Sequence, residues 1–283
     1  MKILLTGCDG FMANELISGL EGKYLLYKTN RRTLDVLDST AVDKFFDENE
    51  VDCVIHTATS GGRRTCVESP SIFYNNIKMF ENLAKHRAKY KLMFSFGSGA
   101  EKNRKVDIMQ MAEERFLEED SPPSDFYGFS KYMISQRINA INDNIFNFRI
   151  FNLFGASEEN DRMIKNNIIK NMSHLPFEIH QDRVMDFFSS HDLCLVLEYY
   201  MQNISKIFLY KDLNLCYTNK VKLSDVCKEI QKSGKKAWTT FDESGFAPAY
   251  CGSSQRIDSL GIEFLGLSKS IAQMYEFLRR KEW

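Results

Sequence analysis

Short apolar runs alternate with segments of helical periodicity through the first half of the chain. A short apolar run bounded by turn residues indicates a buried strand, whereas apolar residues that recur every three or four positions indicate an amphipathic helix. The pattern predicts strands at residues 2–6, 23–28, 51–56, 91–96 and 147–151, and helices that end near residue 20 or span 39–48, 70–90 and 125–142. Strands that alternate with helices predict parallel βαβ units, and therefore an α/β fold with a doubly wound sheet.

The pattern becomes less regular after Gly155. Residues 158–172 are polar with helical spacing, residues 187–200 predict a return to the sheet and a further helix, and residues 222–283 predict short helices and loops. We predict a first domain over residues 1–155 and a smaller lobe over 156–283, with about 185–215 returning to the first domain's sheet. In open α/β sheets the ligand lies at the carboxyl ends of the strands, so we expect the site in a cleft between the two parts.

The composition narrows the class of protein. Of the 283 residues, 43% are apolar and 27% are charged, which predicts a substantial core, and a net charge of −1 provides no broad field for nucleic acid or an anionic membrane. The N-terminal apolar run is too short for a signal peptide, and no apolar stretch is long enough to span a membrane. The seven cysteines follow no CxxC spacing, which favours reduced thiols and a cytoplasmic protein. No metal-ligand spacing surrounds His180 or His191, and we expect no metal.

A glycine-rich turn follows the first predicted strand. Gly7 and Gly10 permit a tight turn and a close approach of the backbone to a pyrophosphate, and the helix that follows would offer free N–H groups to its negative charge. Ala13 is small enough to let helix and strand pack closely. The turn therefore predicts a dinucleotide site, and the alternative is an ordinary connection between a strand and a helix.

The residues after the second predicted strand bear on which nicotinamide cofactor fits. An acidic residue at this place would hydrogen-bond the ribose 2′-OH of NAD. This chain has Asn30, Arg31 and Arg32 instead, and arginine suits a 2′-phosphate through charge-assisted hydrogen bonds. We therefore predict NADP(H) rather than NAD, and the alternative is a solvated basic loop.

Tyr127 and Lys131 lie four residues apart in a predicted helix and therefore share one face. An ammonium beside a phenol stabilises the phenolate, so we expect Lys131 to lower the pKa of Tyr127. Ser98 lies upstream, shortly after a predicted strand. The alternatives are a chance pair on a surface helix and a serine that bonds only to backbone.

The joint order and spacing of these motifs resemble the extended short-chain dehydrogenase/reductases, and among them the GDP-L-fucose synthase-like nucleotide-sugar 4-ketoreductases. The matching stretches are residues 6–11, 31–39, 51–58, Gly61-Gly62, Asn76, 96–98, 127–131, 152–155, 186–188 and 192–193. The resemblance implies that the first predicted domain is a Rossmann-like dinucleotide-binding domain and that the second lobe mainly binds substrate.

The resemblance also implies roles for individual residues. Ser98, Tyr127 and Lys131 would be catalytic, and Lys131 would also hold the nicotinamide ribose. Asn76 would order the backbone of the active site, and Asp38 would meet the adenine edge, with Asp35 as the alternative. The implied cofactor contacts are Gly7, Gly10, Phe11, Met12, Asn30, Arg31, Arg32, Asp38, Ser39, Ala58, Thr59, Asn76 and Lys131.

Substrate contacts are expected from both halves of the chain. The resemblance implies Gly99 and Asn152 as substrate contacts. Arg183 and Arg256 are candidates for a phosphate, or else ordinary surface arginines. Arg63 and Arg64 are either solvated or reach over the cleft.

The chain departs from fucose synthase at the residues that epimerise. Ala100 stands where that enzyme has a cysteine, and the region near Arg162 lacks its histidine. Gly99 and Ala100 also stand where the 4,6-dehydratase branch has an Asp-Glu pair. We therefore predict a simple NADPH-dependent reduction of the 4-keto group of a nucleotide-diphospho-4-keto-6-deoxy-sugar, for a deoxysugar of a surface polysaccharide.

Two alternatives stay open. One is a 4-epimerase that retains NAD and returns the hydride to the opposite face of the sugar, and the other is a non-catalytic NADP-binding sensor of the same fold. We expect a nucleotide-diphosphate sugar as substrate, no nucleic-acid or membrane partner, and a homodimer.

Overall fold

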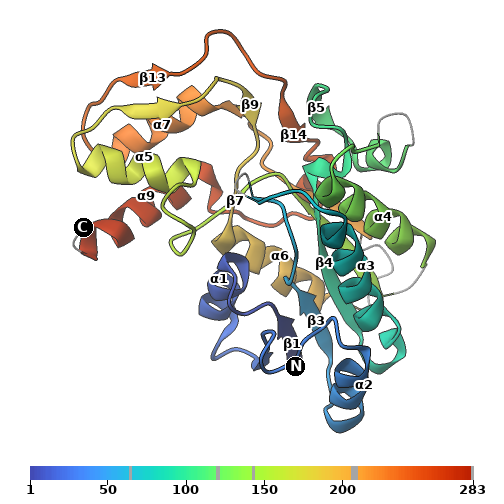
Figure 1. The fold of residues 1–283 in the computed structure, drawn as a ribbon. Helices are drawn as coiled ribbons and strands as arrows, with labels where there is room; N and C mark the ends of the chain where they lie inside the picture. The colour runs from blue at the N-terminus through green and yellow to red at the C-terminus, as the bar shows by residue number, and fades with distance from the viewer. Residues whose placement is uncertain (64–65, 119–121, 142–143, 205–209, 282–283) are drawn as a thin grey trace.

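Six parallel strands form the central sheet (Figure 1). They are β1 (Lys2–Thr6), β2 (Leu25–Lys28), β3 (Cys53–His56), β4 (Leu92–Ser98), β6 (Ile145–Ile150) and β11 (Asp212–Leu215). The computed structural model describes residues 1–63, 66–118, 122–141, 144–204 and 210–281. The strand order β11-β6-β4-β3-β1-β2 places the switch point of the sheet between β1 and β3. The predicted α/β class with a doubly wound, Rossmann-like sheet is confirmed.

Helices cover both faces of this sheet. One face carries α1 (Phe11–Leu20) and α6 (Ser190–Gln202), and the other carries α2 (Ser39–Glu48), α3 (Pro70–Ala84) and α4 (Phe126–Ala140) (Figure 1). Alternate residues of a strand point to opposite faces, so Ile3 and Leu5 pack under α1 and α6 whereas Leu4 packs under the other three helices. This double burial explains why the strands read as continuous apolar runs.

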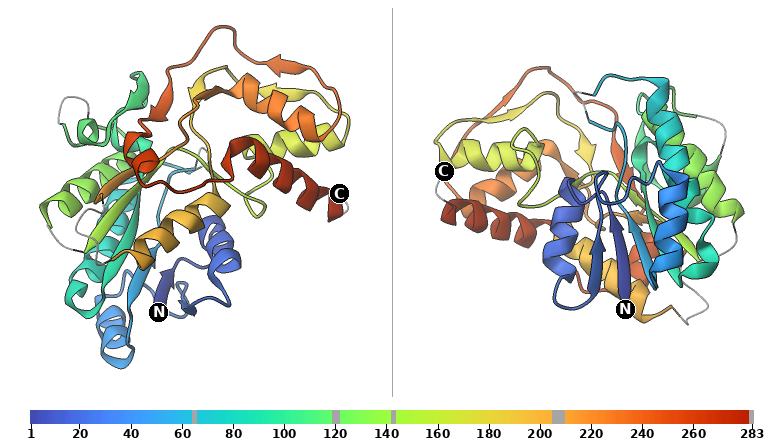
Figure 2. Two further views of the ribbon diagram at one scale, coloured as in Figure 1. Left: turned by 180° about the vertical axis from the view of Figure 1, so that it is seen from behind. Right: turned by 60° about the horizontal axis from the view of Figure 1, so that its bottom comes forward.

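The C-terminal lobe lies beyond the carboxyl ends of the sheet strands (Figures 1 and 2). Its apolar core gathers α5 (Met163–Met172), α7 (Leu223–Ser233), α9 (Gly266–Arg280) and β8 (Phe177–Ile179), which pairs with β13 (Thr239–Phe241). The short helix α8 (Gln255–Ser259) packs beside β11. The division of the chain near residue 155 stays a prediction.

A small sheet connects the two parts of the chain. Its strands are β12 (Val221–Lys222), β9 (Val184–Met185), β14 (Tyr250–Gly252) and β5 (Ile108–Met111), in that order. Nearby, β7 (Leu153–Phe154) pairs with β10 (Phe188–Ser189). Because β5 comes from the first half of the chain and β14 from the last, their pairing brings the end of the chain close to the carboxyl end of β4.

Two predicted helix boundaries are wrong. The helix expected over residues 70–90 ends at Ala84, because the chain turns so that His86 Nε2 bonds Asp43 Oδ1 at 2.8 Å and its ring stacks on Phe46. The helix expected from residue 158 begins at Met163, because Lys165 Nζ donates to the carbonyl oxygens of residues 156 and 158 and closes that segment as a turn.

The helix predicted over residues 39–48 is α2, and the Asp38 carboxylate caps it by accepting hydrogen bonds from the N–H groups of Thr40 and Ala41 at 2.9 and 3.2 Å. The last helix, α9, has 15 residues and is not short. Its apolar residues pack against α7, which supplies the stability that periodicity alone does not reveal.

Two further findings bear on the compositional expectations. Within the described residues, every helix is too short or too polar to cross a bilayer. All seven cysteines are free: Cys66 is exposed, Cys8 is partly buried and the other five are buried.

Candidate active site

Ser98, Tyr127 and Lys131 meet at the carboxyl end of β4. Ser98 is the last residue of β4, and the other two lie in the first turns of α4, which begins where the Asp125 carboxylate accepts a hydrogen bond from Gly128 N–H at 2.7 Å. The Ser98 side chain lies beside the Tyr127 phenol and acts to lower the pKa of Tyr127. The Lys131 ammonium lies 5.7 Å from the centre of the Tyr127 ring. The structure thus brings the three expected catalytic side chains together.

The pKa of Tyr127 is raised, whereas we expected Lys131 to lower it. Burial raises the pKa of the phenol, and the neighbouring Ser98 side chain and the charge of Arg104 only partly offset this. The Lys131 ammonium donates a hydrogen bond to the carbonyl oxygen of Phe96 at 2.9 Å, and its own burial lowers the pKa of Lys131 to about 8. Tyr127 therefore holds its proton, which is the form that a proton donor needs.

Two glycines pack against the Tyr127 ring. Gly61 and Gly62 have φ values of +77° and +84°, a left-handed backbone that favours glycine. A Cβ atom on Gly62 would lie 2.8 Å from Cε2 of Tyr127, and one on Gly61 would lie 2.8 Å from Cγ2 of Ile72. Only glycine lets this loop approach the phenol so closely, and the loop in turn holds the ring in place.

Asn76 joins this loop to α4. Its Oδ1 atom accepts a hydrogen bond from Ser60 N–H at 2.7 Å, and its Nδ2 atom donates to the Ser60 carbonyl oxygen at 3.0 Å and to Ser130 Oγ at 2.9 Å. The Ser130 hydroxyl donates to the carbonyl oxygen of Tyr127 at 2.7 Å. The network links the loop before Gly61 to the turn of α4 that carries Tyr127.

A buried carboxylate holds the backbone of Ser98. Glu101 Oε1 accepts a hydrogen bond from Ser98 N–H at 2.9 Å, while Ser98 Oγ accepts one from Ala100 N–H at 3.2 Å. These are the reciprocal bonds of a capping box, and the spacing Ser98-x-x-Glu101 is a signal in the sequence that could have identified Glu101. The geometry leaves the Ser98 hydroxyl hydrogen available for another acceptor.

Arg149 balances the charge of Glu101. Its guanidinium donates to Glu101 Oε2 at 2.6 and 2.9 Å, and both side chains are fully buried. It also donates to Asn214 Oδ1 at 3.0 Å and Asp212 Oδ2 at 2.9 Å, and lies 4.0 Å from the centre of the Phe116 ring. A buried charge is tolerated when its hydrogen-bonding capacity is satisfied in this way.

The expected pyrophosphate turn lies at the switch point of the sheet. Gly7 has a φ of +76°, and a Cβ atom there would lie 2.7 Å from the backbone nitrogen of Ala58, at the end of β3. Gly10 is the N-cap of α1 and no side chain caps the helix that opens at Phe11 and Met12. The close approach of Gly7 to Ala58 leaves no room for a side chain in this turn, and the uncapped N–H groups of α1 fit a pyrophosphate.

The loop after β2 presents two exposed arginines, Arg31 and Arg32. Asn30 shapes the loop: its Nδ2 atom donates to the Asp9 carboxylate at 3.0 Å and its Oδ1 atom accepts from Arg32 N–H at 3.0 Å. Free guanidinium groups at this place fit a phosphate.

Three other expected cofactor contacts have partners within the protein. Asp38 caps α2, Ser39 Oγ accepts a hydrogen bond from Lys85 Nζ at 2.7 Å, and Thr59 Oγ1 lies 3.4 Å from Asn76 Oδ1. These bonds leave each of the three side chains with further hydrogen-bonding capacity.

Gly99 and Asn152, the substrate contacts that the resemblance implies, both contact other parts of the protein. A Cβ atom on Gly99 would lie 2.6 Å from Phe151 and 2.7 Å from Tyr250, so aromatic rings lie over this position. Asn152 Nδ2 donates to the carbonyl oxygen of Asp186 at 3.1 Å, which ties β7 to the segment before β10.

The candidate arginines lie in different places. Arg183 is at the site, with its guanidinium 5.7 Å from the centre of the Tyr250 ring. Arg256 donates to the carbonyl oxygen of Asp212 at 2.8 Å and pairs with Glu114. Asp212 begins β11 and lies about 10 Å from the level of Ser98, toward the amino ends of the strands. Arg63 pairs with Glu159, and Arg64 lies outside the described residues.

Two residues without a sequence signal lie beside the expected catalytic groups. The Oη atom of Tyr250, in β14, is 3.5 Å from Ser98 Oγ. Arg104 bonds Asp125 at 3.0 Å, and its charge lowers the pKa of both Tyr127 and Tyr250 against the effect of burial. Their contribution depends on contacts between distant parts of the chain.

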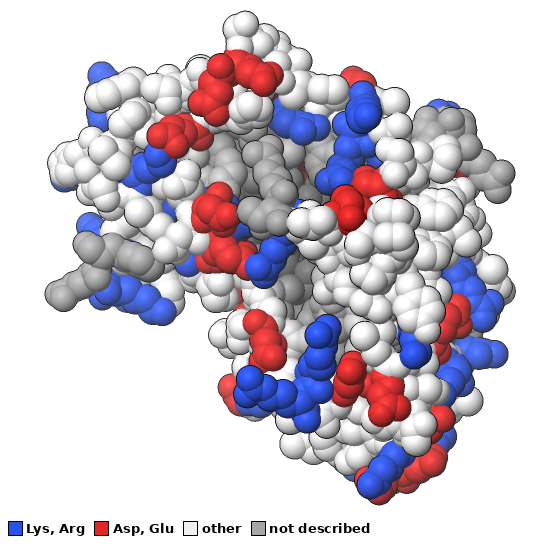
Figure 3. All heavy atoms as spheres, in the orientation of Figure 1, with Lys and Arg blue, Asp and Glu red and all other residues white. Residues whose placement is uncertain are grey.

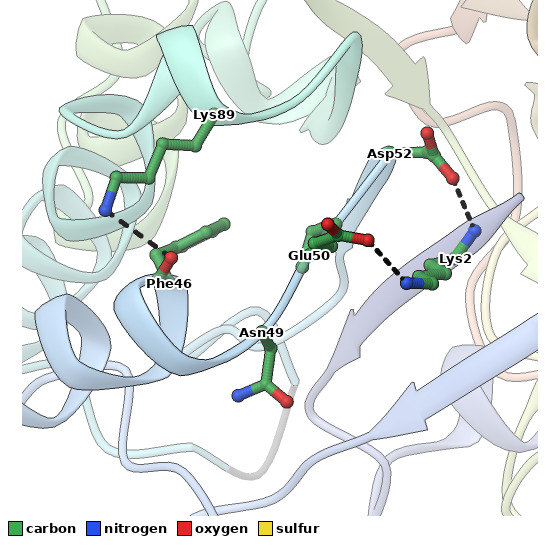
Figure 4. A pocket seen from close by; sticks show the side chains of 7 residues that line it. Lys2, Phe46, Asn49, Glu50, Asp52 and Lys89 are labelled. Carbon is green, nitrogen blue, oxygen red and sulfur yellow. Dashed lines mark hydrogen bonds and ion pairs between the residues drawn. The ribbon is translucent and has the colours of Figure 1, made fainter.

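Two surface hollows lie away from the candidate active site, and neither is lined by Ser98, Tyr127 or Lys131. One, of about 380 Å³, is at the amino ends of β1 and β3, where its charged groups pair with one another, as Lys2 does with Glu50 at 2.7 Å (Figure 4). The other, of about 240 Å³, lies between α1, α6 and α9. Acidic and basic side chains intermix over the face drawn in Figure 3, so neither sign of charge dominates it.

Solved structures of low sequence identity share the fold. A GDP-mannoheptose C4 reductase from Campylobacter jejuni with NADP bound has a TM-score of 0.81 at 21% identity, with 98% of each chain covered. A dTDP-4-dehydrorhamnose reductase from Clostridium acetobutylicum has a TM-score of 0.80 at 19% identity, with 99% of this chain and 100% of that chain covered. A UDP-glucose 4-epimerase from Thermus thermophilus in complex with NAD has a TM-score of 0.77 at 16% identity, with 99% of each chain covered.

The sequence itself identifies the family. No curated protein matches the chain. The family described as "NAD dependent epimerase/dehydratase family" matches residues 3–216, which include the Gly7 turn, Ser98, Tyr127 and Lys131. The match spans most of the chain and the whole central sheet, so the chain belongs to the NAD-dependent epimerase/dehydratase family.

Proposed function

We propose that the protein reduces the 4-keto group of a nucleotide-diphospho-4-keto-6-deoxy-sugar with NADPH. The observation that carries the proposal is the meeting of Ser98, Tyr127 and Lys131 at the carboxyl end of β4, on the same sheet edge as the Gly7 turn. Two structures of the same fold are named as nucleotide-sugar reductases, and they support the proposed class of reaction. They are a GDP-mannoheptose C4 reductase and a dTDP-4-dehydrorhamnose reductase.

The reduction divides among the three side chains. When bound, NADPH supplies a hydride to the keto carbon. Ser98 Oγ donates a hydrogen bond to the keto oxygen, where negative charge develops. Tyr127 gives its proton to that oxygen, a step that contributes about 10²–10⁴-fold, and the Lys131 ammonium stabilises the resulting phenolate and binds the nicotinamide ribose.

The surroundings of Ser98 favour reduction alone. Glu101, the carboxylate nearest in sequence, is held by Arg149 and by Ser98 N–H, and Gly99 and Ala100 carry no acid or base. Burial raises the pKa of Tyr250, so this phenol keeps its proton and is a poor base. Around Ser98, the described part of the chain therefore offers no ready base to remove a proton from the carbon next to the ketone.

NADPH is the proposed donor because Arg31 and Arg32 are exposed at the end of β2. The double substitution Arg31→Ala, Arg32→Ala should weaken NADPH binding about tenfold or more and leave NADH binding unchanged, because only NADPH carries the 2′-phosphate. Equal losses for the two cofactors would contradict this assignment.

The experiment that tests the reaction is a panel of 4-keto-6-deoxy sugars linked to GDP, dTDP, CDP and UDP, generated in place by dehydratases. We expect NADPH absorbance to fall with at least one of them and an alcohol two mass units heavier than the ketone to form. Tightly bound NAD with interconversion of two sugars and no NADPH use would favour the 4-epimerase. NADPH binding without turnover of any sugar would favour the sensor.

A homodimer through α3 and α4 is the proposed assembly. These helices pack side by side and leave Tyr74, Phe129 and Met133 exposed, with Phe73 stacked on Phe129 at 5.3 Å. Light scattering should give twice the chain mass, and Phe129→Lys should give the monomer. The free cysteines support a cytoplasmic location for the protein. We further propose that the deoxysugar product is incorporated into a surface polysaccharide.

A further inference from the structure

A tyrosine from the end of the chain lies against the catalytic serine. Tyr250 and Ser98 are 152 residues apart, yet their hydroxyl oxygens are 3.5 Å apart and Tyr250 is only 7% exposed. We infer that Tyr250 is a positioning residue that donates a hydrogen bond to Ser98 Oγ and so leaves the Ser98 hydrogen directed at the keto oxygen. This inference rests on the proposed reductase function.

The inferred direction of the bond follows from the hydrogen-bonding capacity of Ser98 and from its proposed role as a donor to the keto oxygen. A serine hydroxyl has one hydrogen and two acceptor sites. Ala100 N–H already donates to one acceptor site at 3.2 Å. If the Tyr250 phenol donates to the second, the Ser98 hydrogen stays available for substrate, whereas a bond in the other direction would consume it. Burial raises the pKa of Tyr250, so its O–H remains intact as a donor.

The packing around Tyr250 is shaped to hold its ring at this place. Gly99 lies under the ring, where a Cβ atom would approach Tyr250 Cζ to 2.7 Å. Phe151 meets the ring edge to face at 5.3 Å, and Gly252 makes room for Phe151 in turn, since a Cβ atom there would approach Phe151 to 2.7 Å. The separation of 3.5 Å is long for a hydrogen bond, and such contacts in a free active site often shorten when substrate binds.

Asp186 and its ion-pair partner Lys220 fix the backbone around Tyr250. The N–H group of Asp186 donates to the carbonyl oxygen of Tyr250 at 3.1 Å, and the Asp186 carboxylate accepts from Gly252 N–H at 2.8 Å. Lys220 Nζ binds both carboxylate oxygens of Asp186 at 2.9 and 3.1 Å. β14 is therefore held at the carbonyl group of Tyr250 and at Gly252, which limits the movement of the Tyr250 phenol relative to Ser98.

A double-mutant cycle on turnover tests the inference. Tyr250→Phe should lower kcat about tenfold, the effect of one hydrogen bond, and leave the Kd for NADPH unchanged. In the Ser98→Ala background, Tyr250→Phe should lower kcat less than twofold further, because the residue through which it acts is gone. Tyr275→Phe is the matched control: this buried phenol bonds Asn171 Oδ1 at 3.0 Å in the core of the C-terminal lobe, and its removal should leave kcat unchanged.

Two results would overturn the inference: wild-type kcat in Tyr250→Phe, or the same loss of kcat in both backgrounds, which indicates a general structural role. Should Tyr250→Phe fail to fold, Tyr250→Met, which also lacks the hydroxyl, takes its place in the same cycle. Failure of the proposed function is distinguishable, because the unmutated protein would then bind NADPH and consume none of it with any keto sugar.

Discussion

The candidate site has two walls that are built by different means. The first wall consists of Ser98, Tyr127, Lys131 and the Gly61-Gly62 loop, and its side chains are placed by the end of a long strand and the first turns of a helix. The second wall consists of Tyr250, Gly252, Asp186 and Lys220, and its strand has only three residues and is held by a buried ion pair.

This difference between the walls indicates in which part of the site a mutation should change activity and stability together. Regular secondary structure positions the first wall, so a change of one functional group there should remove activity and leave the fold intact. One ion pair positions the second wall, so its loss should affect stability and activity together. Five substitutions or titrations test this contrast.

The largest effect is expected at Tyr127. Tyr127→Phe removes the proton donor, so kcat should fall by about 10²–10⁴-fold while the melting temperature and the Kd for NADPH stay unchanged. Tyr132→Phe, a buried tyrosine of the same helix, is the control and should keep full activity. A Tyr127→Phe enzyme with normal kcat would show that the first wall does not carry the chemistry.

The second wall should respond to Lys220→Met. This change leaves the Asp186 carboxylate buried without its cation, which should cost about 3–5 kcal/mol and lower the melting temperature by roughly 10 °C. Lys228→Met removes an exposed pair with Asp225 and should leave the melting temperature unchanged. An unaltered melting temperature in Lys220→Met would contradict the view that the Lys220–Asp186 ion pair holds the second wall in place.

The pH dependence of the unfolding free energy sharpens this test. Burial raises the pKa of Asp186 to about 6, above its ordinary value of 3.8. A carboxyl whose pKa is raised in the folded protein favours stability at low pH, and this contribution is lost as pH rises through the folded value. Removal of the Lys220 charge should raise the pKa of Asp186 further, so Lys220→Met should regain part of its stability as pH falls toward about 4, because a neutral Asp186 needs no cation.

Gly62→Ala should displace the Tyr127 ring of the first wall through a steric clash. Its φ of +84° makes any side chain costly by roughly 1–2 kcal/mol, and its Cβ atom would also press on the Tyr127 ring. We expect kcat to fall roughly tenfold through misplacement of the phenol. Gly22→Ala is a close control, since Gly22 has a φ of +85° and no atom within 4 Å of the added Cβ, so it should share the backbone cost and keep its kcat.

The smallest effect is expected from titration of Lys131. Burial lowers the pKa of Lys131 to about 8, so in the free protein this side chain loses its charge in a range where an ordinary lysine keeps it. The Kd for NADPH should rise by roughly threefold to fivefold as pH increases through about 8, because a neutral amine binds the ribose less strongly than an ammonium. Lys131→Arg keeps its charge, and a profile with the same inflection in that variant would assign the titration to another group.

The parts of the site that follow from local spacing were predictable. Tyr127 and Lys131 share a helix face because they are four residues apart, and Gly7 lies at a strand end because the apolar run before it stops there. The pKa of Tyr127 was not predictable in the same way, since its direction depends on burial by the Gly61-Gly62 loop and on the place at which Lys131 donates its hydrogen bond.

The sequence by itself determined the doubly wound sheet, the glycine turn at Gly7 and the Ser98, Tyr127 and Lys131 group, because periodicity and short spacing act within single elements and their immediate connections. Only the tertiary structure decided that Tyr250 meets Ser98, that Arg149 pairs with Glu101, and that Arg256 lies away from the site. These contacts join residues 44 to 152 positions apart. Such contacts exist only after the sheet, the second lobe and the small connecting sheet have packed together, and no local pattern in the chain encodes which side chains will then face one another.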